Sequence, residues 1–259
     1  MSPADDKRAK QQPQCSFCTF GLIVTGAGEE EFLPGLFRSL TGGAGCSFRV
    51  LRRIGQRNPI TSIAKRLMMV GSGKVIPTED EEQIGMEARR FLRNQPCRFV
   101  ILIDDMEHPR RSWIAQVFAR YRAALDTMLL HDEKQRAAVH FFATMLEAYY
   151  FAHSAAVNTA LGASVFASDF AGDVETIRHP KNELKNKFAG FDARSQGALI
   201  VPMLDLDHIL SNPQTCAFLR SLFAWCVRQL TERCPVYDSN LSTRYQIPGG
   251  VQADLTNRQ

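Results

Sequence analysis

Acidic residues gather at two places where a buried strand would end. The groups are Glu29, Glu30 and Glu31 after the apolar run FGLIVTG (20–26), and Asp104, Asp105 and Glu107 after FVILI (99–103). Carboxylates about 4 Å apart repel each other by about 4 kcal/mol per pair at an effective dielectric constant near ~20. A protein that brings them together therefore needs a positive charge between them. Mg²⁺ or Mn²⁺ fits this need, because Mg²⁺ takes carboxylate oxygens and leaves positions for water and substrate phosphates.

A further acid, Glu147, stands in the apolar and aromatic segment FFATMLEAYYFAH. An unpaired carboxylate among such neighbours would be costly to bury. Glu147 is therefore expected to have a metal, an arginine or a lysine as its partner.

Each acidic group also has a structural interpretation. Glu29 to Glu31 fall in the first turn of an expected helix, where the helix dipole favours acids. Asp104 could cap the following helix or form an ion pair with Arg110 or Arg111. These alternatives stay open from the sequence alone.

Basic residues near these acids are candidates for phosphate binding. They are Arg52, Arg53, Arg110, Arg111 and Lys181. Arginine suits two-point contact with a phosphate, and lysine acts as a point charge. Lys181 is favoured because it follows His179-Pro180 in a segment that could return to the site. The alternative for such charge runs is a solvated surface.

The elements that must position these residues alternate between strand and helix. Strands are expected at 20–26, 47–55 and 99–104, and helices at 26–43, 79–96 and 110–129. Almost wholly apolar strands are buried on both faces, which indicates an α/β fold with a mostly parallel sheet covered by helices on both faces. Ligands of such sheets bind at the carboxyl ends of the strands, where the acids fall.

The rest of the chain predicts a helical or irregular C-terminal elaboration of one domain. Residues 1–14 read as a disordered tail, 15–235 as the α/β domain with an insertion at about 162–197, and 236–259 as a C-terminal tail. Residues 197–210 are compatible either with a strand that turns at Pro202 or with a loop that enters a helix. The pattern of residues 213–234 is typical of a helix.

Composition narrows the class of protein. With 259 residues, 45% of them hydrophobic, the chain can bury a full core. The net charge of +4 neither indicates nor excludes a nucleic-acid binder. No apolar run is long enough for a membrane helix or secretory signal, so a cytoplasmic protein with no membrane partner is expected.

The seven cysteines are then expected to be free thiols. Cys15 and Cys18 form a C-x-x-C motif, but no second close pair of Cys or His accompanies it. A zinc or redox role for this pair is therefore the minor interpretation, and an N-terminal segment entering a strand is the major one.

Several common catalytic motifs are absent. The chain has no G-x-x-x-x-G-K-[ST], which argues against a P-loop ATPase. It has no G-x-S-x-G either, which argues against an α/β-hydrolase.

Four segments in a fixed order resemble the Toprim-like proteins. The segments are VTGAGEEEFL, ILIDDME, MLEAYYFAH and HPKNELK, and they span roughly residues 20–230. Within that group the chain is similar to an uncharacterised bacterial family related to the OLD-type nucleases and often found in defence operons. In this resemblance Glu29 matches an acid of the first motif, and Asp104 matches the first acid of the Toprim D-x-D motif. Glu147 matches the glutamate of a later E-A motif, and Lys181 matches the lysine of a later P-K motif.

The resemblance implies a Toprim-like fold and an Mg²⁺- or Mn²⁺-dependent nuclease that hydrolyses nucleic-acid phosphodiesters. It implies a bacterial anti-phage or genome-maintenance system with an ATPase partner protein. Asp104 would bind metal, Asp105 or Glu107 would complete its ligands, and Glu29 or Glu31 would bind a second metal or relay a proton.

The chain departs from the pattern at three positions. Thr25 replaces the first-motif acid before glycine, Met106 replaces the second acid of D-x-D, and His153 replaces a later aspartate. These changes favour the alternative function, a catalytically altered binding or regulatory subunit of an ATPase-containing defence complex. The choice between DNA and RNA, and the formation of a homo-oligomer, stay open.

Overall fold

The protein is built on a four-stranded parallel sheet. The computed structural model describes residues 14–42, 45–57, 69–70, 74–75, 79–234 and 240–253. The sheet has the order β2-β1-β5-β6, and all its pairs are parallel. Its strands are β1 (Cys18–Val24), β2 (Cys46–Arg53), β5 (Arg98–Met106) and β6 (Ala137–Ala143). The predicted α/β class with a parallel sheet is therefore confirmed.

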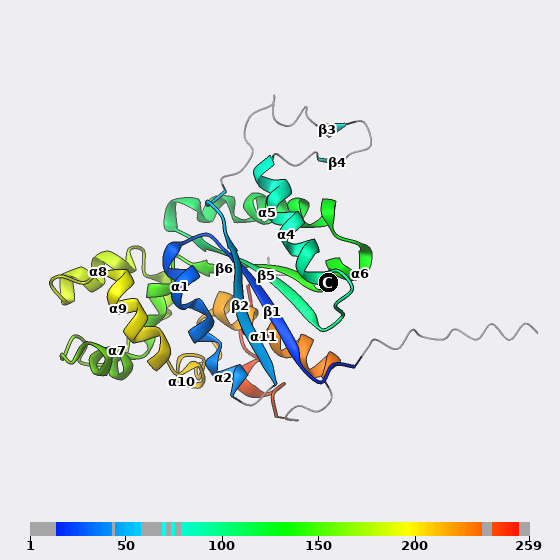
Figure 1. The fold of residues 1–259 in the computed structure, drawn as a ribbon. Coiled ribbons are helices and arrows are strands. Elements are labelled where there is room, and N and C mark those ends of the chain that lie inside the picture. Colours follow the sequence, from blue (N-terminus) through cyan, green and yellow to red (C-terminus); the bar gives the residue numbers. More distant parts are fainter. Residues whose placement is uncertain are drawn as a thin grey trace, which may run out of the picture.

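Two helices cover one face of this sheet. They are α4 (Glu79–Leu92) and α5 (Ile114–Met128), which lie side by side (Figure 1). Their apolar side chains pack on the even-numbered residues of β5, including Val100 and Leu102. The short η1 (His108–Trp113) connects β5 to α5, and α6 (His131–Lys134) precedes β6.

Three other helices cover the opposite face. They are α1 (Ala27–Leu36), α2 (Arg38–Thr41) and α11 (Ala217–Arg233). The core here is aromatic: Phe20 of β1 stacks on Phe48 of β2 with ring centroids 4.6 Å apart, and Phe37 stacks on Phe48 at 4.0 Å. Helices on both faces match the expectation from the apolar strands.

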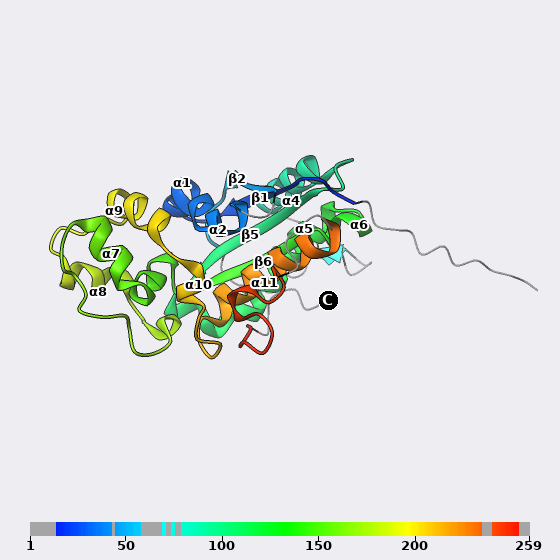
Figure 2. The same cartoon turned by 90° about the horizontal axis from the view of Figure 1, so that it is seen from below.

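A helical region follows β6. It contains η2 (Leu146–Ala152), α7 (Ser154–Leu161), η3 (Val174–Thr176), α8 (Pro180–Lys187), α9 (Ala193–Ile200), η4 (Val201–Met203) and α10 (Leu206–Ile209). Figures 1 and 2 both show α7, α8 and α9 grouped to one side of the sheet. Of the two interpretations of 197–210, the strand is wrong, because Pro202 lies within η4 between two helices. None of the helices among the described residues has both the length and the apolar character needed to cross a membrane.

Part of the predicted C-terminal tail packs on the domain. The tail predicted at 1–14 lies outside the described residues except for residue 14. Within 236–259, residues 240–253 include η5 (Arg244–Gln246), and Tyr245 is buried with its hydroxyl 3.0 Å from Ser39 Oγ. The widely spaced apolar residues of this segment have no periodicity, so the sequence did not reveal their burial. The two remaining short strands, β3 (Met69–Val70) and β4 (Lys74–Val75), form a separate antiparallel pair.

Candidate metal centre

The two adjacent aspartates at the end of β5 face opposite sides of the sheet. Side chains alternate along a strand, so Asp104 shares the α5 face with Leu102, and Asp105 shares the α1 face with Ile103. Both are buried, with Asp104 fully enclosed and Asp105 7% exposed. The pair predicted to act together is thus divided between two environments.

Asp104 is bound by protein groups on both of its oxygens. Thr25 Oγ1 donates to Asp104 Oδ1 at 2.8 Å, since the register of Val24 with Ile103 brings Thr25 beside Asp104. Arg110 Nη2 and the Tyr121 hydroxyl donate to Oδ2 at 2.8 and 3.0 Å. Arg110 also donates to the Asp105 carbonyl at 2.5 Å, so it holds the end of β5 in place. This is the structural alternative of an Arg110 ion pair that the sequence left open.

Asp105 lies in a second set of charges that comes from three different strand ends. Glu29 follows β1 at the start of α1, and Glu147 follows β6 at the start of η2. We call Glu29, Asp105 and Glu147 the acidic cluster. Lys181 Nζ at the start of α8 reaches Glu147 Oε1 at 3.2 Å, which provides the cationic partner expected for that residue.

The position of Glu29 depends on local helix geometry. In the first turn of α1 only Glu29 is buried, whereas Glu30 and Glu31 point outward to Arg53 at 3.1 Å and Arg194 at 2.8 Å. The Glu29 carboxylate folds back over Gly26, where an added Cβ would collide with it. Glycine at position 26 therefore makes room for the buried acid.

The position of Glu147 depends on a strained turn. Thr144, directly after β6, has φ +82°, a conformation that a β-branched residue rarely adopts. Thr144 is fully buried, and its N–H donates to the Met106 carbonyl at 3.0 Å. Such strain costs of the order of 1–3 kcal/mol and persists only where surrounding contacts impose it. Here it turns the chain so that Glu147 lies near Asp105.

The charges of the cluster interact strongly. Burial, followed by the charges of Glu29 and Glu147, raises the pKa of Asp105 well above its usual range. Burial also raises the pKa of Glu147, against the opposing effect of Lys181. Burial and then the charges of Glu147, Glu29 and Asp105 raise the pKa of the Tyr150 hydroxyl well above its usual range.

Each member of the cluster has a buried oxygen without a hydrogen-bond partner among the described residues. These atoms are Glu29 Oε2, Asp105 Oδ1 and Glu147 Oε2, and the Tyr150 hydroxyl is also unpaired. Buried polar atoms are normally paired, so these oxygens suit a ligand such as a hard divalent cation, which prefers oxygen. The ligand atoms are not all within 4.8 Å of one another; among the described residues, only Cys15, Cys18 and Cys234 form a group of that kind. Mg²⁺ does not require three protein ligands so close together, because one or two carboxylates commonly hold it together with water and phosphate.

The other predicted site residues lie at the edge of this site or elsewhere. Glu107 is exposed at the start of η1, and Arg52 donates to Gln83 on the surface. Arg111 donates to the Glu175 carbonyl, which gives it a structural contact. Of the predicted basic residues in the described part of the chain, Lys181 is the one that pairs with a carboxylate of the acidic cluster.

Tyr121 and Tyr150 were missed by sequence reasoning. Both are fully buried; the Tyr121 hydroxyl donates to Asp104, and the charges of the acidic cluster act on the Tyr150 hydroxyl. Tyr150 had a sequence signal, since it lies three residues after Glu147 in the same aromatic segment. Tyr121 had none, because it lies 17 residues from Asp104 on a separate helix.

The expectation of seven free thiols is wrong, because Cys15 and Cys97 form a disulfide. The 82 residues between them gave no spacing signal, and β1 and β5 bring them together as neighbouring strands. The five other cysteines are free and buried.

Comparisons of this chain with protein-family models, with curated proteins and with solved structures find no match.

Proposed function

We propose that the acidic cluster binds a divalent cation, Mg²⁺ or Mn²⁺, and that the protein hydrolyses phosphodiester bonds of nucleic acid. The observation that carries this proposal is the set of three buried carboxylate oxygens at the carboxyl ends of the strands that have no hydrogen-bond partner in the described part of the chain. The Toprim-like order of the four sequence segments supports it, since Glu29, Glu147 and Lys181 are three of the residues matched by that resemblance.

The charge of the cluster favours an added cation. Three ionised carboxylates with one nearby lysine leave an excess of negative charge in a buried place, which costs free energy unless it is neutralised. A divalent cation would remove that excess. When bound, it would stabilise negative charge on a phosphoryl oxygen and lower the pKa of a coordinated water.

The chain's own residues have separate tasks in this proposal. Asp105 and Glu147 hold the cation, and Glu29 adds a third negative charge beside it. Lys181, whose side chain is 43% exposed, extends from the cluster toward solvent, where it can contact a substrate phosphate. Asp104 acts as a positioning residue, because its contacts to Arg110, Thr25 and Tyr121 fix the end of β5.

The direct test is a cleavage assay with plasmid DNA, single-stranded DNA and transfer RNA, in Mg²⁺, in Mn²⁺ and in chelator. We expect at least one of these substrates to be cut, and we expect the cutting to require the metal. Asp105→Asn and Glu147→Gln should each reduce the rate of cleavage by at least about 100-fold, because each removes a carboxylate charge that holds the metal beside the substrate phosphate.

Glu31→Gln is the matched control, since Glu31 lies on the same helix turn as Glu29 but is exposed and pairs with Arg194. It should cut like the wild type. Metal-dependent cutting that survives Asp105→Asn and Glu147→Gln would place the activity elsewhere, and absence of cutting with every substrate would exclude a nuclease that acts alone.

A second candidate function is a non-catalytic binding or regulatory subunit of a complex that contains an ATPase. The observation that favours it is the full engagement of Asp104, the match to the first D-x-D acid, by Arg110, Thr25 and Tyr121. This function predicts that the cluster binds the cation and that the protein retains nucleic acid on a gel without cutting it. Copurification with an ATPase, lost on Lys181→Glu, would support it further.

A further inference from the structure

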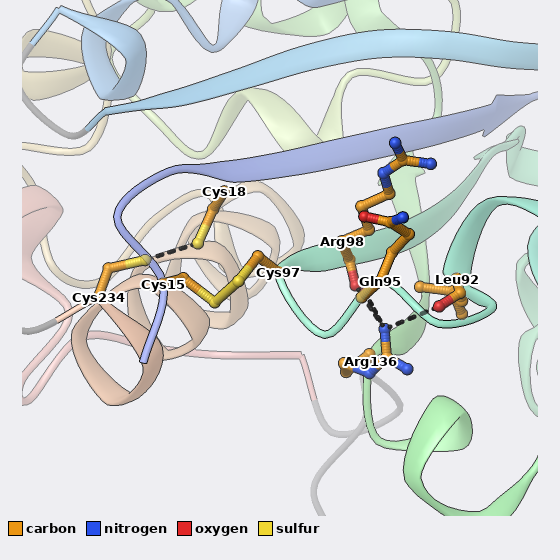
Figure 3. The surroundings of a disulfide bond; sticks show 8 residues. All are labelled: Cys15, Cys18, Leu92, Gln95, Cys97, Arg98, Arg136 and Cys234. Carbon is orange, nitrogen blue, oxygen red and sulfur yellow. Dashed lines mark hydrogen bonds between the residues drawn. A yellow bond between two sulfur atoms is a disulfide. The ribbon is translucent and has the colours of Figure 1, made fainter. Parts of the chain in front are cut away.

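Four cysteines converge at the edge of the sheet opposite the acidic cluster. We call Cys15, Cys18, Cys97 and Cys234 the cysteine cluster. Figure 3 shows the Cys15–Cys97 disulfide beside the Cys18 and Cys234 side chains, whose sulfurs are 2.6 Å apart. The Sγ atoms of Cys15, Cys18 and Cys234 all lie within 4.8 Å of one another.

This spacing suits a tetrahedral metal site. Four thiolates around zinc, each at about 2.3 Å, have sulfurs about 3.8 Å apart. The sulfurs of Cys15, Cys18 and Cys234 already lie within a space of about this size, and the Cys97 sulfur is bonded to that of Cys15. Breaking the disulfide would free Cys97 to move toward the other three sulfurs as the fourth ligand. The C-x-x-C pair, Cys15 and Cys18, thus gains the second pair of cysteines that the sequence did not reveal.

The cluster joins three distant parts of the chain. Cys15 and Cys18 lie before and at the start of β1, Cys97 precedes β5, and Cys234 follows the last residue of α11. Cys15 N–H also donates to the Arg233 carbonyl at 2.7 Å. A closed site with four protein ligands leaves no position for substrate, which is typical of structural rather than catalytic zinc.

The surroundings carry positive charge that a dianionic zinc–thiolate centre needs. Arg233 is 8% exposed, its Nε has no hydrogen-bond partner among the described residues, and it interacts electrostatically with Cys18. Arg136, also buried, donates to the carbonyls of Gln95 and Arg98 at 2.8 and 3.1 Å and thereby fixes the loop that carries Cys97 (Figure 3).

We propose that Cys15, Cys18, Cys97 and Cys234 bind one zinc ion as thiolates, and that the Cys15–Cys97 disulfide is the oxidised, metal-free form of the same site. A dithiol reductant supplies two electrons and two protons to the disulfide, which yields two thiols and the oxidised reductant. Binding of Zn²⁺ by the four thiols then releases four protons. The site is independent of the nuclease proposal, because it lies at the other edge of the sheet.

The test is a metal titration of the whole protein after reduction by a dithiol in anaerobic buffer. Co²⁺ serves as the spectroscopic probe, and one equivalent should produce the intense visible bands of tetrahedral cobalt–thiolate. One equivalent of Zn²⁺ should bleach these bands and raise the melting temperature. The unreduced protein, with Cys15 and Cys97 joined, should give a much weaker spectrum.

Variants assign the ligands. Cys18→Ser and Cys97→Ser should each lose the tetrahedral thiolate spectrum, and Cys97 is only partly buried, so its replacement is the less disruptive of the two. Cys216→Ala is the control, because Cys216 is about as buried as Cys18 but lies beside Asp173 and Glu175 instead. A reduced, folded wild-type protein without the cobalt spectrum would overturn the proposal, as would a Cys216→Ala variant that loses the spectrum together with the other two.

Discussion

Asp104 and Asp105 are neighbours in the chain, yet their energetic roles are opposite. Asp104 balances the buried guanidinium of Arg110 and accepts bonds from Thr25 and Tyr121, so its charge is compensated. Asp105 adds negative charge beside Glu29 and Glu147, and its Oδ1 has no partner among the described residues. The first aspartate stabilises the fold, and the second costs stability that a bound cation would recover.

We expect Asp105→Asn to stabilise the metal-free protein at neutral pH by about 1–3 kcal/mol, because it removes a poorly compensated buried charge. The pKa of Asp105 is near 3.8 in the unfolded chain and is raised in the folded state. At a pH between these two values, the folded chain therefore holds this proton more tightly than the unfolded chain does. Stability therefore falls as pH rises through that window. The measurement is urea unfolding in chelator at pH 5 and at pH 8. The free energy of unfolding should fall less between pH 5 and pH 8 in the variant than in the wild type.

Asp104→Ala is the contrasting variant for the same measurement. It leaves Arg110 buried without its counter-charge, so it should lower the free energy of unfolding by about 3–5 kcal/mol. Equal destabilisation by both variants would contradict the division of roles between the two aspartates.

At the scale of elements, a side chain from η3 caps α11, the longest of the described helices. The Glu175 carboxylate accepts from the Phe218 and Leu219 N–H groups at 3.1 Å each and from the Tyr149 hydroxyl at 2.8 Å. Burial raises its pKa to about 7, although these hydrogen bonds oppose the shift. The first N–H groups of a helix have no partner within the helix, and an acid there also complements the helix dipole.

Glu175→Ala should lower the free energy of unfolding by about 2–4 kcal/mol, since it leaves buried donors on α11 and Tyr149 unpaired. The measurement is chemical unfolding followed by circular dichroism. Glu183→Ala, at an exposed position of α8, is the control and should change stability by less than about 0.5 kcal/mol. A similar small effect for Glu175→Ala would show that the cap is dispensable.

Most elements were predictable because their hydrophobic patterns are local. The apolar runs predicted β1 and β5 with bounds close to those found, and the amphipathic spacing predicted α4, α5 and α11. The region of 162–210 was less predictable, since its short helices are polar and depend on side-chain caps such as Asp192 and Asp205. The Glu175 cap lies 43 residues from Phe218, so no local pattern could reveal it.

On the scale of the whole molecule, the parallel sheet separates two groups of reactive side chains. The acidic cluster lies at the carboxyl ends of β1, β5 and β6, and the cysteine cluster lies at the amino ends of β1 and β5. The rule for α/β sheets predicted the first of these, because acids directly follow the strands. It could not show that Asp104 and Asp105 divide between two faces until the register and the covering helices were known. The cysteine cluster depends on long-range contacts such as that between Cys18 and Cys234, which are 216 residues apart, and a single sequence does not disclose them.

Titration of Mn²⁺ into the folded, chelator-treated protein by calorimetry tests the central claim, a divalent cation held by the acidic cluster, most directly. We predict saturable binding of one ion per chain in the wild type, retained in Cys18→Ser and lost in Asp105→Asn. Absence of binding to the wild type, or undiminished binding to Asp105→Asn, would contradict the claim.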